Sequence, residues 1–160
     1  MRFFLRGSAG GFSFIELLIA SALILVLASV AVPLTQVTIQ RQKEVTLKRS
    51  LRILRSAIDS YKDAVDLGEI DNGAEDGDET GYPPDLAILV TGVETLSEET
   101  DTKRKFLRRI PIDPFTGDGD WGLRSYEDSA RSTRWSGGNV YDVYSRNRGT
   151  ALDGTRYRDW

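Results

Sequence analysis

The side chains of this sequence that could do acid–base or metal chemistry are carboxylates, because the chain contains no histidine and no cysteine. These absences remove Ser-His and Cys-His nucleophile pairs, histidine acid–base catalysis and zinc sites built from His or Cys. Two carboxylates can still act as acid and base, but the pair Asp118 and Asp120 has no further candidate group that the sequence places beside it. We therefore expect no enzymatic activity, and no disulfide.

Glu16 stands out among the carboxylates because it lies at the start of an uncharged run from Leu17 to Gln40. As a helix rising about 1.5 Å per residue, this run would be roughly 36 Å long. Its most apolar part, Leu17 to Leu34, is close to the roughly 20 residues that cross a bilayer. Ionisable groups in such segments are rare and usually functional. The sequence thus predicts an apolar helix with one carboxylate near its start that needs a partner.

Three interpretations fit this N-terminal region. The first is a secretory signal peptide cleaved after Ser29-Val30-Ala31, although Glu16 is unfavourable in such a peptide. The second is an ordinary single membrane span in which Glu16 is hydrated near the interface. The third is a short leader that is removed ahead of the apolar run, so that the helix stays in the mature protein.

The third interpretation is favoured by a motif. The residues Gly11-Phe12-Ser13-Phe14-Ile15-Glu16-Leu17 resemble the cleavage and methylation site of type IV prepilins and type II secretion pseudopilins. The resemblance implies that prepilin peptidase cuts after Gly11 and methylates the new N-terminus, giving N-methylphenylalanine at Phe12. Counted from Phe12, Glu16 is the fifth residue and Pro33 the twenty-second, where this family has its glutamate and often a proline.

The resemblance also implies a division of the chain. Residues 1–11 are expected to be a cleaved leader and residues 12–40 a transmembrane helix that forms the filament core. Residues 41–160 are expected to be a periplasmic or extracellular head, which includes the amphipathic helix half 41–67.

Two residues of the apolar helix are expected to serve assembly. The resemblance implies that Glu16 of one subunit pairs with the amine of Phe12 on a neighbour, since a buried charge is tolerated when it is paired. Pro33 lacks an N–H group and should bend or locally melt the helix. A span that simply ends at Pro33 is the alternative.

The head is predicted to be α+β. Beyond residue 41, apolar side chains recur every three or four residues, as on one face of a helix. This apolar stripe consists of Leu47, Leu51, Leu54, Ile58, Tyr61 and Val65. We predict a single long helix that ends near Leu67-Gly68 and packs on a small antiparallel sheet. The expected strands are 121–127 and 139–145, with a turn at Gly137-Gly138 before the second.

The segments between the helix and these strands are predicted to be mainly loops. Residues 69–81 are acidic and Gly-rich without a basic side chain, which is typical of a solvated loop. Asp85 is expected to cap a short helix at 87–90, and residues 94–105 should be a loop with some helix. Residues 106–117 resemble a segment of major pseudopilins in which an apolar pair leads into a Pro-x-Asp-Pro turn.

In major pseudopilins the C-terminal tail folds around a calcium ion, and Asp153-Gly154 resembles the Asp-Gly of that tail. The resemblance implies Asp142, Asp153 and Asp159 as candidate ligands, because Ca²⁺ accepts oxygen donors from irregular loops. Turn formation accounts for Asp153-Gly154 equally well. The tail also carries side chains that oppose a cation, namely Arg146, Arg148, Arg156 and Arg158.

The cysteine-free head favours a pseudopilin over a type IV pilin, whose C-terminal region is usually closed by a disulfide. The expected function is that of a structural subunit of a periplasmic filament that drives type II protein secretion. The subunit is expected to be a single-pass protein of the bacterial inner membrane with its head in the periplasm. The implied partners are further copies of the chain, other pilin-like subunits, prepilin peptidase, the inner-membrane assembly platform, and lipid before assembly.

Two alternatives remain open. One is a type IV pilus subunit, major or minor. The other is a single-span membrane-anchored binding module in which Trp121, Trp135 and Trp160 hold a ligand, although aromatics in a small head are more often core. A nucleic-acid partner is not expected, because the formal net charge is −3 and such a partner requires a basic face.

Overall fold

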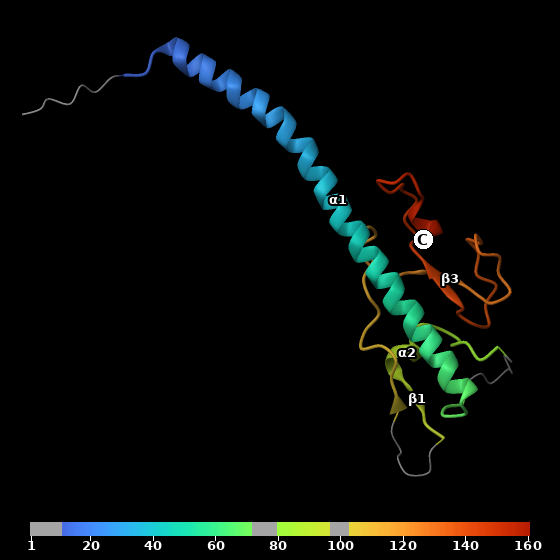
Figure 1. Cartoon of the computed structure of the whole chain (residues 1–160). Coiled ribbons are helices and arrows are strands. Elements are labelled where there is room, and N and C mark those ends of the chain that lie inside the picture. The colour runs from blue at the N-terminus through green and yellow to red at the C-terminus, as the bar shows by residue number, and fades with distance from the viewer. Residues whose placement is uncertain (1–10, 72–79, 97–102) are drawn as a thin grey trace, which may run out of the picture. The chain divides into compact units, whose positions relative to one another are not determined.

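The computed structural model describes residues 11–71, 80–96 and 103–160 (Figure 1). Most of the expected leader and the middle of the acidic segment lie outside the described residues. The chain divides into two compact units, Met1–Ile39 and Gln40–Trp160.

The longest element is α1, a helix from Phe14 to Asp66. It begins where the N–H groups of Glu16 and Leu17 donate to the Ser13 carbonyl, at 3.0 and 3.2 Å. The helix passes Pro33 without a break, so it neither melts nor ends there. Proline removes one backbone hydrogen bond, while the turns on either side keep theirs. No helix in the described part of the chain is both long and apolar enough to cross a membrane.

Gly68 ends α1, as the sequence predicts. Gly68 has a φ of 67°, a left-handed conformation that favours glycine. Its N–H donates to the Val65 carbonyl and the N–H of Glu69 donates to the Ala64 carbonyl, both at 2.9 Å. This pair of bonds is the Schellman motif, which satisfies the last carbonyls of a helix. The predicted boundary is therefore confirmed to within two residues.

The hydrophobic core of the head forms along one face of α1. Five of the six residues in the predicted apolar stripe are at most 2% exposed, and the sixth, Val65, packs against the same core. Small residues on the same face, Ala57 and Ala64, are buried as well. Apolar residues of the later segments complete the core: Ile70, Leu86, Leu89, Leu107, Trp121, Val140, Val143, Ala151 and Tyr157. Burial of this face, rather than helix propensity, stabilises the second half of the helix.

The head is α+β as predicted, but its strands form two small antiparallel sheets instead of one. β1, Val93–Glu94, pairs with β2, Lys103–Arg104. β3, Gly122–Arg124, pairs with β4, Asp142–Tyr144, which places Leu123 opposite Val143. A Cβ atom at Gly122 would lie 2.2 Å from the Tyr144 ring, so glycine is required there by packing.

The connections agree with the sequence in part. The Asp85 carboxylate accepts a hydrogen bond from the Ile88 N–H at 2.8 Å and so caps α2, Ile88–Thr91, as predicted. The expected strands 121–127 and 139–145 are real but shorter. Gly137 and Gly138, with φ of 90° and 83°, form the turn before β4. Helix was expected within 94–105, but its described residues contain strand pairing instead; residues 97–102 lie outside the description.

Candidate functional site

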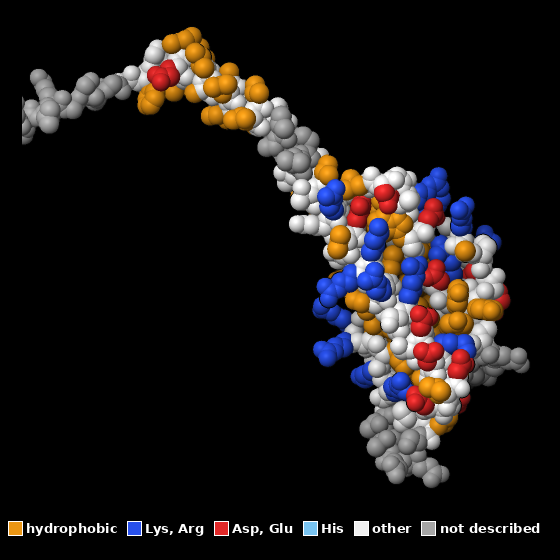
Figure 2. Space-filling model, in the orientation of Figure 1, with side chains coloured by type: hydrophobic (Ala, Val, Ile, Leu, Met, Phe, Trp, Pro, Cys, Tyr) orange, Lys and Arg blue, Asp and Glu red, His pale blue; other side chains and the backbone are white. Residues whose placement is uncertain are grey.

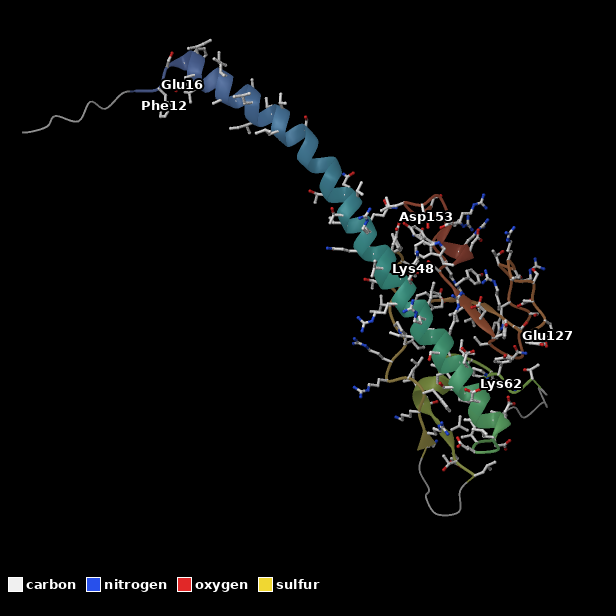
Figure 3. All side chains as sticks on the ribbon, in the orientation of Figure 1. Phe12, Glu16, Lys48, Lys62, Glu127 and Asp153 are labelled. Atoms are coloured by element: carbon white, nitrogen blue, oxygen red, sulfur yellow. The ribbon has the colours of Figure 1, made fainter. Side chains whose placement is uncertain are left out.

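The N-terminal motif lies at the exposed start of α1. Gly11, Phe12 and Ser13 precede the helix in extended or irregular backbone, and all three are exposed. Phe12 and Glu16 are labelled at this end of the helix in Figure 3. The Glu16 carboxylate is exposed, and it forms no ion pair with any residue that the structure describes. The expected cleavage point and the carboxylate are therefore both accessible, one turn apart, while residues 1–10 lie outside the description.

The apolar side chains that follow are uncovered. Each large apolar residue between Phe12 and Leu27 is from 50% to 77% exposed. Figure 2 shows these side chains crowding the N-terminal part of α1, whereas charged side chains gather over the head. Contiguous apolar surface of this extent on a protein marks a site of contact with lipid or protein. The side chain of Pro33 lies outside the part of the chain that the structure describes.

The expected calcium ligand Asp142 is already paired with two guanidinium groups. One of its carboxylate oxygens accepts from Arg55 Nε at 2.7 Å and the other from Arg124 Nη1 at 2.9 Å. Arg124 is only 4% exposed, so its pair with Asp142 is largely desolvated, whereas the Arg55 side chain is 39% exposed. Arg55 lies on α1 and Arg124 on β3, and the carboxylate from β4 joins the two elements.

The same two arginines hold the tail through its backbone. Arg55 Nη2 donates to the carbonyls of Val143 and Trp160 at 3.1 and 2.7 Å. Arg124 Nη2 donates to the Arg158 carbonyl at 3.1 Å, and its Nε donates to the Ser132 carbonyl at 3.0 Å. Guanidinium groups thus satisfy backbone carbonyls of the kind that a bound cation would otherwise coordinate.

The other two candidate ligands have local roles. Asp153 Oδ1 accepts from the Thr155 hydroxyl at 2.6 Å and from the Thr155 N–H at 2.9 Å. The bond from the Thr155 hydroxyl, and to a smaller extent the bond from the Thr155 N–H, lowers the pKa of the Asp153 carboxyl. Such bonds from an aspartate to the residue two positions on are typical of a turn, here at Asp153-Gly154. Asp159 lies 3.8 Å from Arg158 Nε.

A calcium ion does not fit this arrangement. The described residues contain no group of three or more acidic side chains placed to hold a metal ion. Asp142 has both oxygens engaged by guanidinium groups, and a cation bound there would face two positive charges. Arg55, Arg124 and Asp142 join the tail to α1 and β3 through side-chain hydrogen bonds.

We expect the thermal unfolding midpoint of the detergent-solubilised full chain to be the same with a chelator as with millimolar Ca²⁺. Binding of calcium at 100 times its Kd would add about 2.7 kcal/mol and raise the midpoint by about 5 °C or more. Circular dichroism at increasing temperature measures this midpoint. A rise of that size with Ca²⁺, absent with Mg²⁺, would restore the calcium prediction.

Two structural carboxylates of the head were not singled out by the sequence. Glu44 Oε1 accepts from the Tyr157 hydroxyl and the Leu152 N–H, both at 2.9 Å, which joins α1 to the tail. Asp113, in the Pro-x-Asp-Pro turn, is 1% exposed and accepts from the Ser145 hydroxyl and the Phe115 N–H. The structural roles of Glu44 and Asp113 follow from their burial and their hydrogen-bond partners. Burial and partners of this kind cannot be read from the spacing of residues in the sequence.

Comparison with protein-family models, with curated proteins and with solved structures finds no match to this chain.

Proposed function

We propose that this chain is a structural subunit of a type IV pilin-like filament, most like the major pseudopilin of type II secretion. The observation that supports this most strongly is the uncovered apolar surface from Phe12 to Leu27, directly behind an accessible Gly11-Phe12 bond. In water this surface is unfavourable, at about 25 cal/mol for each Å². Lipid before assembly, and the same helix of neighbouring subunits after it, would cover the surface.

Glu16 has a specific role in this proposal. Removal of residues 1–11 exposes a new amine at Phe12, which carries a positive charge near neutral pH, and a single added methyl group keeps that charge. When helices pack side by side, that amine and the Glu16 carboxylate of a neighbour leave water together. A charge that is desolvated alone is costly, so pairing favours the aligned arrangement of subunits over others.

The N-terminus of the native protein tests the proposal directly. Mass spectrometry of the chain purified from membranes should find a first residue Phe12 that carries one extra methyl group. A chain that begins at Val32 would identify a secretory signal peptide. An intact Met1 would identify an ordinary single-span protein, and either result would overturn the filament proposal.

The Glu16→Gln variant should still be processed at Gly11 but should fail to form filaments. Glutamine keeps the size of the side chain and removes the charge, so the neighbouring amine stays buried without a counter-charge, a loss of about 3–5 kcal/mol per subunit. Electron microscopy of sheared cells that overproduce the chain measures filaments, and mass spectrometry measures processing. The Ser21→Ala variant is a matched control, because the Ser21 hydroxyl is uncharged and donates to the Leu17 carbonyl of its own helix. Normal filaments from Glu16→Gln would contradict the role of Glu16.

A further inference from the structure

A second feature of the head is a concave pocket on the side of the β3–β4 sheet. Its volume is about 510 Å³, within the range of small-ligand sites. Four segments form it: β3, β4, the connection between them, and the tail. Its lining residues are Leu123, Thr133, Trp135, Tyr144, Ser145, Arg146, Arg148 and Arg158.

The charge of this pocket is of one sign. Three of its lining residues are arginines, and none is acidic. Arg146 pairs with Asp120 at 2.6 Å, and Arg158 lies 3.8 Å from Asp159. Arg148 forms no ion pair with any of the residues that the structure describes. The pocket thus holds at least one uncompensated guanidinium group in a chain whose formal net charge is −3.

The walls of the pocket are fixed by hydrogen bonds. The Tyr144 hydroxyl donates to the Thr133 carbonyl at 3.1 Å, and the Trp135 indole N–H donates to the Asn139 carbonyl at 2.8 Å. The Tyr144 ring also stacks against the Arg124 guanidinium, 4.2 Å from the ring centroid. These contacts join the connection between the strands to the sheet, so the pocket is formed before any ligand arrives.

From this geometry we propose that the pocket binds carboxylate groups. The planar guanidinium group can donate two parallel N–H bonds to a carboxylate, and Arg148, which has no ion pair among the described residues, is the donor that this site offers. Arg146 and Arg158 add positive charge to the lining, although each lies near a carboxylate of its own. The aromatic walls give the carbon part of the ligand an apolar contact. The tail of this chain thus contributes arginines to a site that suits an anion. The site does not depend on whether the chain forms filaments.

The carboxylates have two possible sources, a small free molecule or a second copy of the chain. Residues 69–79 of the chain contain six carboxylates and no basic side chain: Glu69, Asp71, Glu75, Asp76, Asp78 and Glu79. Citrate serves as the probe for a free carboxylate, and a synthetic peptide of residues 69–79 serves as the probe for the second copy.

Titration of each probe into the full chain in detergent, at pH 7 and constant ionic strength, tests the site. We expect a saturable change in tryptophan fluorescence, because Trp135 lines the pocket. Bound ligand should also raise the thermal unfolding midpoint, and the Trp135→Phe variant should lose the optical signal but keep that rise. Arg148→Gln should weaken binding about tenfold, since it removes a charged hydrogen-bond donor. Arg131→Gln is the matched control, an exposed arginine outside the pocket, and should bind like wild type.

The probe that binds shows where the bound carboxylate comes from. Saturation by citrate alone indicates a free carboxylate ligand, and tighter saturation by the peptide indicates the acidic segment of another copy. The absence of saturable binding by either probe would overturn the proposal. Equal weakening by Arg131→Gln and Arg148→Gln would also overturn it, because the effect would then come from the general charge of the chain.

Discussion

The Asp142→Asn variant should lose about 3 kcal/mol of unfolding free energy. Asparagine keeps one acceptor oxygen but removes the charge that both Arg55 and Arg124 face at 2.7 and 2.9 Å. Removing one partner of a buried ion pair costs about 3–5 kcal/mol, because the other charge stays desolvated. Asp142 is itself partly exposed, so the lower end of this range applies. Urea unfolding of the full chain in detergent, followed by circular dichroism, measures the loss.

The exposed pair between Asp120 and Arg146 provides the control for this variant. Its side chains are 62% and 52% exposed, so the Asp120→Asn variant should lose no more than about 1 kcal/mol. If Asp142→Asn were as stable as Asp120→Asn, the tail would be held by something other than this arginine network.

The Tyr61→Ala variant should be the most destabilised single substitution in the core, by about 3–5 kcal/mol. Tyr61 is fully buried on α1, and its ring meets the edge of Phe106 with centroids 5.3 Å apart. Truncation leaves a cavity the size of a phenol group between α1 and residues 106–117. Thermal unfolding measures the loss, and a change below about 1 kcal/mol would mean that the core repacks.

The Tyr61→Phe variant separates the ring from the hydroxyl. Burial, with the charges of Asp71 and Asp85 adding to it, raises the pKa of the Tyr61 phenol to about 12. In the unfolded chain the Tyr61 phenol ionises near pH 10. The stability that the folded state gains by keeping this phenol protonated is therefore complete below pH 10 and is lost as the pH rises toward about 12. Wild type should therefore lose more stability than Tyr61→Phe between pH 10 and 12. Parallel curves for the two proteins would contradict the shift.

Helical parts of the head were predictable because their signals are local. The spacing of Leu47, Leu51 and Leu54 fixes the buried face, and Gly68 fixes the end of the helix. The strands were located but overestimated in length, because β-forming side chains near 121 and 139 say nothing of where pairing stops. β1 and β2 were missed, since each has two residues and no period can be read from two residues.

The N-terminal motif and the tail show the same contrast. The resemblance of Gly11 to Glu16 to a prepilin site is visible in the sequence, because the motif is contiguous, and it stays a prediction. The role of Asp142 could not, since its partners Arg55 and Arg124 are 87 and 18 residues away along the chain. From the sequence alone, the Asp142 carboxylate is equally consistent with a metal ion or with arginine, and only the folded structure places the two guanidinium groups beside it.

The bonds between α1 and the tail have a consequence for the order in which the head folds. Glu44 and Tyr157 are 113 residues apart, and Arg55 and Trp160 are 105 apart. Contacts between such distant residues close long loops of the chain. The conformational entropy of these loops must be lost before the contacts can stabilise the folded head. During synthesis Glu44 and Arg55 can make their contacts with the tail only after residues 150–160 have emerged. Refolding should accordingly be slow for a protein of this size, in the range of milliseconds to seconds.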